Sequence, residues 1–527
     1  MQARIKSHKA VTPASSQSHD AGHELEIKFR TDFAGLEQAK IFLCGDEAVA
    51  LPSLKLQSRY FDTPSGCLRN AGVGLRLRSG ERSGTVQTVK SVGAAHGGPF
   101  QRRETEVSAV GSTPDISLFD KKSAAFLAKL IGKETLAEQA ETTIKRERLM
   151  VPSGASSVEI SFDDGFAKAG IRKIDIREIE LELKSGNALD LYALAIRLAK
   201  ALPLRLDFSS KAAKAFGLMT GDQPVAIKAK PIQFNRSMTL SNLATAIFSN
   251  GLEHFVGNWP AFLETRQPES IHQMRVALRR LRLALALFGR ELGDDALETL
   301  RAKARHIAAA LGHVREIDVF RENAEKLSRS NSRSAYDMEQ LLIVLDKLRG
   351  HAYYDAALIL DDCKTTVFAL EIQSLASKYG QGGMFGDKET LDISAIHFAE
   401  KTLDRLHERV LKRGEHFAKM DAEQRHELRI AFKNLRYAVG FLSGLHPMNL
   451  RTKTYLSHVS AIQEVLGAQN DAVMAEQFVE ANLAGLGDAV HAGAMAVVKA
   501  QRVRKSAGER ILIRRWHEFK ETEIFWA

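Results

Sequence analysis

The stretch HELEIKFR, residues 23–30, alternates polar and apolar side chains without interruption. Successive side chains of a β-strand point to opposite faces, so a strand here would gather its charged residues on one face. Those residues are Glu24, Glu26 and Lys28. A strand at the surface of a half-exposed sheet shows the same alternation. The pattern therefore predicts a strand, and other segments must decide whether its charged face is a site or a solvated surface.

The same alternation recurs through the first 217 residues. Turn residues such as Asp164-Gly165 separate the candidate strands. We expect strands at 23–30, 54–61, 74–78, 85–89, 102–107, 142–151, 157–163 and 174–184, with helices near 33–43, 116–130 and 188–201. Many short strands with few long helices predict a closed or strongly curved sheet.

The charged faces of these strands would converge if the apolar faces pack outward against the helices. The clearest case is IREIELELK at 176–184, which places Glu178, Glu180, Glu182 and Lys184 on one face. Carboxylates are hard oxygen ligands for Mg²⁺ or Mn²⁺, and Arg and Lys bind phosphate oxygens. An interior that carries both would suit a metal-bound polyphosphate. For any one strand alone, a solvated outer face remains the alternative.

Length and composition favour a multidomain protein with an anionic partner. A chain of 527 residues exceeds what one core usually organises. Its formal net charge of +10 indicates a polyanion such as nucleic acid, an anionic membrane or a phosphate polymer. The three cysteines have no chelating spacing and predict free thiols in a reducing compartment. No apolar run approaches the roughly 18 residues of a membrane span, and residues 1–21 have no apolar core of a signal peptide. We therefore expect a cytoplasmic protein with a disordered tail at 1–21 and no membrane partner.

The second half of the chain predicts an all-α domain that contains an internal duplication. Residues 218–235 carry two prolines and little periodicity, so we interpret them as a linker, and amphipathic helices fill 236–527. Two helical passages carry a histidine and three cations at the same offsets of 0, 3, 7 and 10, within an arc of roughly 80°. The first set is His272, Arg275, Arg279 and Arg282; the second is His426, Arg429, Lys433 and Arg436. A Leu-Gly pair follows 39 residues after His272 and 40 after His426.

A stripe of like charges on one helix repels itself unless it is solvated, paired with acids or matched to an anion. Two such helices side by side would make a basic groove for a phosphate chain. Aromatic residues are sparse beside the stripes, which argues against single-stranded nucleic acid as a specific partner. Neither His272 nor His426 has a partner at a chelating helical spacing, so we expect both histidines to act as hydrogen-bond donors to phosphate or to neighbouring groups.

Residues 22–217 resemble the CYTH domain, also called the triphosphate tunnel metalloenzyme fold. The matching motifs are ELEIK at 24–28, YFDT at 60–63, LRLR at 75–78, EISFDDG at 159–165 and EIELELKSG at 178–186. The resemblance implies an eight-stranded antiparallel tunnel that hydrolyses triphosphates with Mg²⁺ or Mn²⁺. It implies the metal ligands Glu24, Glu26, Glu180 and Glu182. It also implies the phosphate-binding residues Lys28, Arg76, Arg78, Lys90, Arg102, Arg146 and Lys211. The sequence departs from the family pattern at Lys214-Ala215, where an Arg-Gly pair is common.

Residues 236–527 resemble the CHAD domain, a helical module named for its histidines. The resemblance lies in IHQMRVALRRLR, LGHVREIDV, HELRIAFKNLRYA and IQEVLGAQNDA, and it implies binding of inorganic polyphosphate by the paired basic helices. Together the two parts predict a metal-dependent inorganic triphosphatase that produces diphosphate and phosphate, with polyphosphate bound by the helical domain. The alternatives are a non-catalytic polyphosphate-binding or granule-associated scaffold, and an adenylate cyclase or thiamine triphosphatase on the same fold. Retention of the paired glutamates and the cations favours the enzyme.

Overall fold

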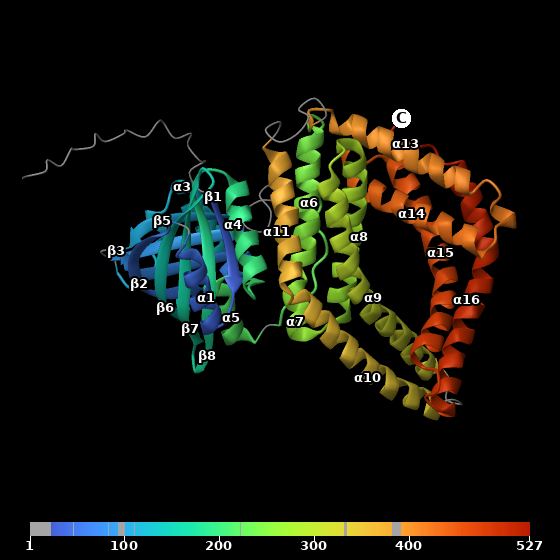
Figure 1. Ribbon diagram of the computed structural model, residues 1–527, viewed down its shortest axis with the longest axis horizontal. Helices are drawn as coiled ribbons and strands as arrows, with labels where there is room; N and C mark the ends of the chain where they lie inside the picture. The colour runs from blue at the N-terminus through green and yellow to red at the C-terminus, as the bar shows by residue number, and fades with distance from the viewer. Residues whose placement is uncertain are drawn as a thin grey trace, which may run out of the picture.

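The computed structural model describes residues 23–527 except 46, 83, 93–100, 110, 222, 331–334 and 382–390. A rolled sheet with flanking helices lies beside a larger array of long helices (Figure 1). This arrangement confirms the predicted α+β tunnel followed by an all-α domain. The expected disordered tail at 1–21 lies outside the described residues.

The sheet is antiparallel, and its strand order is β5-β4-β3-β2-β6-β7-β8-β1-β9. Its strands are β1 (His23–Arg30), β2 (Val49–Asp62), β3 (Val73–Arg82), β4 (Gly84–Val92), β5 (Gln101–Ala109), β6 (Ala137–Ser153), β7 (Ser156–Ala169), β8 (Arg172–Ser185) and β9 (Arg205–Leu206). Because β5 also pairs with β1, strands β1–β8 close into a ring and β9 lies outside it on β1. The expected eight-stranded sheet is thus one strand short, because two residues are too few to show an alternating pattern.

Helices cover the outside of the ring, so the apolar faces of the strands point outward, as expected. These helices are α1 (Phe33–Leu43), α2 (Cys67–Asn70), η1 (Ile116–Leu118), α3 (Lys121–Ile131), α4 (Ala188–Ala201) and α5 (Lys211–Thr220). Ile27 and Phe29 of β1 are fully buried in a core shared with α1 and α4. Leu75 of β3 is buried with residues of α2 and α3. Since side chains alternate along a strand, this packing turns the charged faces into the ring.

The predicted turn at Asp164-Gly165 is wrong, because both residues lie inside β7, which continues to Ala169. Gly165 pairs with Ile144 of β6, and the two strands approach closely there. A Cβ atom on Gly165 would lie 2.0 Å from the carbonyl oxygen of Thr143. The glycine therefore permits a close backbone approach within a strand, a role that mimics a turn signal in sequence.

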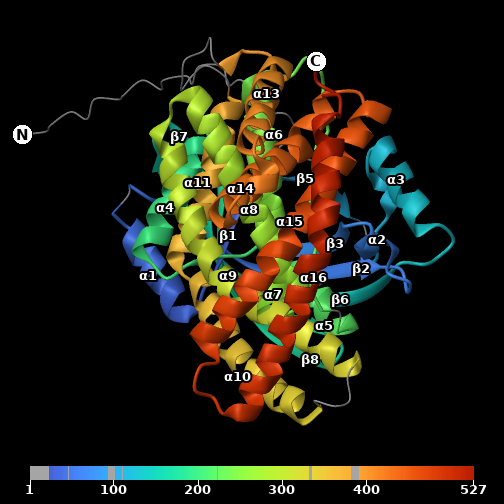
Figure 2. The ribbon, with the colours of Figure 1, turned by 90° about the vertical axis from the view of Figure 1, so that its right-hand side faces the viewer.

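The helical part holds α6 (Leu240–Gly257), α7 (Trp259–Thr265), α8 (Pro268–Leu292), α9 (Asp295–Ser330), α10 (Ala335–Leu360), α11 (Cys363–Gly380), α13 (Ala395–Arg413), η3 (Phe417–Lys419), α14 (Ala422–Leu442), η4 (Ser443–Leu445), α15 (Leu450–Asn482) and α16 (Asp488–Lys520). The two basic stripes lie on α8 and α14. Figure 2 views this part from the side away from the tunnel, with α15 and α16 running along each other. Among the described residues, no helix is both long and apolar enough to cross a membrane.

The two parts meet where α4 packs against α11 (Figure 1). Asp361 accepts ion pairs from Arg30 of β1 at 2.6 Å and from Arg205 of β9 at 2.9 Å. Asn187 and Gln381 exchange side-chain amide hydrogen bonds of 3.0 and 2.7 Å. One apolar core runs from β1 through α4 into α6 and α11. The helical part is therefore attached to the strand that carries the ELEIK motif.

We expect Gly165→Ala to lower the free energy of unfolding by about 1–3 kcal/mol, because the added methyl group must displace backbone in a packed strand pair. Gly74→Ala is the matched control: it is also a strand glycine, and its Cβ would meet nothing within 4 Å. Its effect should stay within about 0.5 kcal/mol. Urea unfolding followed by circular dichroism measures both. Equal effects of the two substitutions would contradict the close approach at Gly165.

Candidate active site

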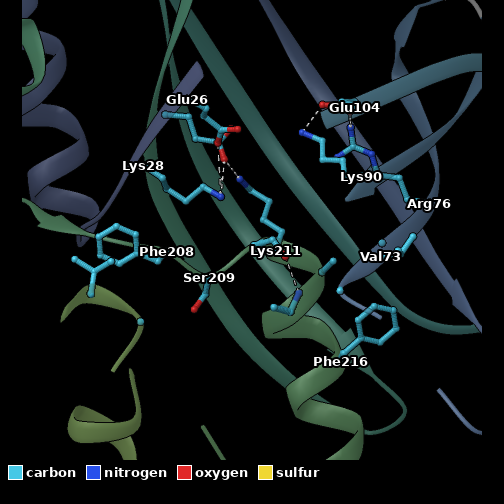
Figure 3. A pocket seen from close by; sticks show the side chains of 18 of the residues that line it. Glu26, Lys28, Val73, Arg76, Lys90, Glu104, Phe208, Ser209, Lys211 and Phe216 are labelled. Carbon is cyan, nitrogen blue, oxygen red and sulfur yellow. Dashed lines mark hydrogen bonds and ion pairs between the residues drawn. The ribbon is translucent and has the colours of Figure 1, made fainter. Parts of the chain in front are cut away.

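The ring encloses most of a cavity of about 810 Å³ that is lined by side chains of both charges (Figure 3). Its carboxylates from the ring are Glu26, Glu104, Glu106, Glu159, Glu180 and Glu182. Its cations from the ring and from the start of α5 are Lys28, Arg76, Arg78, Lys90, Arg146, Arg148, Lys184 and Lys211. The strict alternation of the strands places all of the ring residues on the same inner surface.

One wall of the cavity holds a compact group of six charged residues, which we name the β8 cluster: Lys28, Arg146, Asp163, Glu178, Glu180 and Lys211. Strand register brings it together, because Arg146 lies opposite Asp163 and Asp163 lies opposite Glu178. On the other side of β8, Lys28 lies opposite Glu180. Strands β1, β6 and β7 supply one residue each, and β8 supplies both Glu178 and Glu180. The sixth residue, Lys211, comes from α5.

Lys211 contacts every carboxylate of the β8 cluster. Its Nζ lies 2.8 Å from Asp163, 2.6 Å from Glu178 and 2.6 Å from Glu180. Arg146 forms a bidentate ion pair with Asp163, with hydrogen bonds of 2.7 and 2.6 Å, and also donates to Glu180. Lys28 lies 3.2 Å from Glu180 and 3.7 Å from Glu26. Glu180 is thus shared by three cations.

The cluster remains charged although it is buried. Burial alone would lower the pKa of Lys28, but the charges of Glu178 and Glu180 outweigh it and raise that pKa. Burial would raise the pKa of Glu180, yet Lys211, Lys28 and Arg146 hold it well below its ordinary value. The wall therefore presents fixed charges of both signs in a partly dehydrated space, where electrostatic interactions are stronger than in water.

A second charged group faces the β8 cluster across the cavity (Figure 3). Glu104 of β5 accepts ion pairs from Arg76 at 3.0 Å and from Lys90 at 2.5 Å. Arg76 also lies 3.5 Å from Glu106. A ligand in the cavity would therefore meet cations on two opposite walls.

Several charged residues of the cavity were not among the predicted site residues. Lys184 lies 2.7 Å from Glu182 and 3.8 Å from Glu159, and Arg148 lies 3.5 Å from Glu159. The inner strand faces identified by the alternation include Lys184, Arg148 and Glu159. The sequence pattern therefore contained the signal for these three residues. Lys214 pairs with Glu178 at 2.6 Å from the next turn of α5, and strand alternation could not find it.

The structure brings together most of the residues predicted for this site. Glu26, Lys28, Arg76, Arg78, Lys90, Arg146, Glu180, Glu182 and Lys211 all line the cavity. The side chains of Glu24 and Arg102 lie outside the described residues, although their backbones pair across β1 and β5. Lys211 begins a helix and reaches the cavity from outside the sheet.

The carboxylates of this wall have the chemistry of a site for a hard divalent cation. Asp163, Glu178 and Glu180 each offer an oxygen atom, and these atoms lie within 4.8 Å of one another. Asp163 and Glu178 are fully buried and engaged by Lys211. Glu26, Glu180 and Glu182 are more open, with 15%, 13% and 28% of their side chains exposed. The oxygen-rich donor set fits Mg²⁺ or Mn²⁺ better than a softer metal.

The two basic stripes of the helical part face each other. Burial, together with the positive charges of Arg279, Arg429, Arg275 and Arg282, lowers the pKa of Lys433 to about 7. The guanidinium of Arg279 on α8 donates to the hydroxyl of Tyr437 on α14 at 2.8 Å. The Nε atoms of Arg282 and Arg429 are buried and have no hydrogen-bond partner within the described part of the chain. Glu316 acts on Arg275 and Asp471 on Arg429, but the cations of the two facing stripes outnumber these acids. Such an excess of positive charge is expected of an anion site.

The remaining residues of the two stripes lie at the margin of this group of facing cations. Burial and Arg315 lower the pKa of His272, so that this ring is neutral near pH 7. Arg436 donates instead to Gln463 of α15 at 3.0 Å, and His426 is exposed near the start of α14. Arg436 and His426 are not among the main charges that lower the pKa of Lys433.

The comparisons with known proteins agree with this division of the chain. The model of the CYTH domain matches residues 22–216, and that of the CHAD domain matches residues 246–480. An inorganic triphosphatase of Haemophilus influenzae is 28% identical over 173 residues, which are 32% of this chain and 47% of that protein. The chain thus spans about half the length of this relative.

Two solved structures are similar to parts of this chain. The CHAD domain from the plant Ricinus communis is 27% identical, with a TM-score of 0.50 over 57% of this chain and 98% of that one. PptA from Streptomyces chartreusis is 15% identical, with a TM-score of 0.40 over 53% of this chain and 100% of that one. The matches of the two family models place the charged ring in a CYTH domain and the duplicated basic helices in a CHAD domain that follows it.

Proposed function

We propose that the tunnel hydrolyses inorganic triphosphate to diphosphate and phosphate with the help of Mg²⁺ or Mn²⁺. The observation that carries this proposal is the buried cavity with cations on opposite walls and carboxylates between them. A triphosphate is a compact polyanion that needs many cationic contacts. The likeness of the chain, over 173 residues, to an inorganic triphosphatase of Haemophilus influenzae supports the same substrate.

The cations of the ring would bind and orient the substrate. Lys28, Arg146 and Lys211 lie on one wall, and Arg76 and Lys90 lie on the other, so phosphate groups between them would be held from two sides. Positioning and charge stabilisation supply most of the catalysis of phosphoryl transfer. The ion pairs that now fix these side chains reduce the rearrangement needed when the substrate enters.

The carboxylates would hold the metal and position water. Glu26, Glu180 and Glu182, with Glu24 as a further predicted ligand, are the residues that we assign to metal binding. When bound, a divalent cation supplies charge neutralisation on the phosphoryl oxygens. Asp163 and Glu178 would act differently: they anchor Arg146, Lys211 and Lys214 in place.

We propose in addition that α8 and α14 bind inorganic polyphosphate. The support is the unneutralised charge around Lys433, whose pKa falls to about 7 because burial and four arginines oppose its protonation. A phosphate chain along this surface would remove that repulsion. The Nε–H groups of Arg282 and Arg429 would also gain an acceptor.

Glu182→Gln should raise the divalent-ion concentration needed for half-maximal phosphate release by at least about tenfold, because a neutral amide replaces a charged ligand. Glu141→Gln is the matched control. It also removes a strand carboxylate that is 28% exposed, and this one pairs with Lys168 and does not line the cavity. Phosphate release is titrated with Mg²⁺ and Mn²⁺ for each protein. Identical titrations for the two variants would contradict the assignment of Glu182.

Polyphosphate binding should weaken as the pH rises above about 7, because the phosphate chain favours the protonated form of Lys433 and binding takes up a proton. Affinity should fall by up to about tenfold per pH unit until the higher pKa of the complex is reached, and it should level off below pH 7. Lys433→Arg stays protonated and should flatten this profile between pH 7 and 8.5. Lys453→Arg, an exposed substitution on α15, should keep it.

Equilibrium binding of long-chain polyphosphate at constant ionic strength measures these profiles. Parallel profiles for the wild-type protein and Lys433→Arg would show that another group titrates. No binding by the wild-type protein would reject polyphosphate as the ligand of these helices.

A further inference from the structure

The cavity of the tunnel continues beyond the ring of strands. It passes the start of α5 and reaches the segment between the two domains and one face of α6. Ile227, Lys228 and Lys230 of that segment line it, as do Asn250 and Glu253 of α6. The helical domain thus contributes part of the wall of the space that the tunnel encloses. Neither the sequence motifs nor the roles proposed above use these residues.

The lining segment, residues 227–230, which we name the strap, is fixed to α6. The backbone N–H of Ile227 donates to the side-chain oxygen of Asn258 at 2.9 Å, and the Asn258 amide donates back to the Ile227 carbonyl at 2.9 Å. Asn258 is fully buried. Asn250 donates to the carbonyl of Lys230, also at 2.9 Å. Side-chain amides therefore hold both ends of the strap through its backbone, which leaves its lysine side chains available.

The strap and α6 pack closely. A Cβ atom on Gly257 would lie 2.4 Å from Cδ1 of Ile227, so the glycine makes room for that side chain. The isoleucine is thus an anchor of the strap, and the two lysines on either side of Ala229 are its charged members. Hydrogen bonds and side-chain packing thus hold the strap in a defined position in the cavity wall.

The charged residues of this outer region are two lysines and one glutamate, so positive charge is in excess. Lys228 and Lys230 are exposed, and within the described part of the chain neither ammonium forms an ion pair. Glu253 is the carboxylate that lies nearby: burial raises its pKa, and the charge of Lys230 acts against that rise. Two exposed ammonium groups, of which only that of Lys230 acts on a nearby carboxylate, favour an anionic ligand that extends out of the ring.

We propose that the strap and α6 form a distal phosphate subsite, which takes the additional phosphates of an inorganic polyphosphate chain whose end lies in the ring. This inference rests on the proposed triphosphatase function and extends it to chains of more than three phosphates. A nucleoside would need an open aromatic face here. The nearby Phe208 ring is engaged, since it packs against Trp259 with ring centroids 6.2 Å apart. The two lysines suit further phosphates better than a base.

The test is a comparison of chain lengths in the full-length protein. The double variant Lys228→Ala/Lys230→Ala removes two exposed side chains, so folding should be unaffected. We expect kcat/KM for linear tetrapolyphosphate and pentapolyphosphate to fall about tenfold through KM, with kcat unchanged. For tripolyphosphate kcat/KM should stay within about twofold. Lys121→Ala/Lys122→Ala on α3, which removes two exposed lysines outside the cavity, should leave all of these values unchanged.

Three results would overturn the subsite. An equal loss for tripolyphosphate and the longer chains would mean that the lysines act on the ring itself. No loss for any chain would mean that the strap does not bind phosphate. A loss with ATP but not with tetrapolyphosphate would assign the region to a nucleoside.

The failure of the proposed function would give a different result. In that case the wild-type protein hydrolyses no phosphate chain. Calorimetry then compares the affinities for tetrapolyphosphate and tripolyphosphate in the wild-type protein and in Lys228→Ala/Lys230→Ala. Both proteins keep α8 and α14 intact, so binding at those helices cancels. A preference for the longer chain that disappears in the variant supports the subsite, and identical preferences reject it.

Discussion

Lys211 and the carboxylates around it are the interaction on which this structure depends most. Desolvating several charges is costly, and removing one partner leaves another charge buried without compensation, a loss of about 3–5 kcal/mol. Asp163, Glu178 and Glu180 come from neighbouring strands, and Lys211 joins all three from a helix outside the sheet. The charged faces of β7 and β8 and the docking of α5 therefore depend on each other. A wall built this way keeps charges in place for a ligand that would otherwise have to order them.

The two copies of the duplicated helical unit carry charges at the same positions, but the surroundings of these charges differ. In each copy the first cation of the stripe interacts with an acid that follows the Leu-Gly pair: Arg275 with Glu316, and Arg429 with Asp471. The glycines differ, however. A Cβ atom on Gly312 would lie 2.6 Å from the guanidinium of Arg275, whereas one on Gly467 would meet nothing within 4 Å. The glycine of the first copy thus leaves room for an arginine side chain, whereas the glycine of the second faces open space.

Much of the tunnel could be predicted because alternation is a local signal. It located the strands β1–β8 and most of the inner charges, since a residue's face follows from its position in its own strand. Three features could not be predicted in this way. Lys214 reaches Glu178 from a helix, Gly165 serves a close approach to a neighbouring strand, and the strap enters the cavity through amide contacts with α6. Each depends on segments that are distant in sequence or on the other domain.

The most direct test of the account is a ³¹P NMR time course of the purified full-length protein with tripolyphosphate or ATP, in Mg²⁺ or Mn²⁺ and again with excess EDTA. A charged tunnel that works on inorganic triphosphate should convert tripolyphosphate to equal amounts of phosphate and diphosphate, faster than it consumes ATP, and only with the metal. Contradiction would come from an unchanged tripolyphosphate spectrum, from hydrolysis that persists in EDTA, or from conversion of ATP to diphosphate and a cyclic phosphodiester as the main reaction.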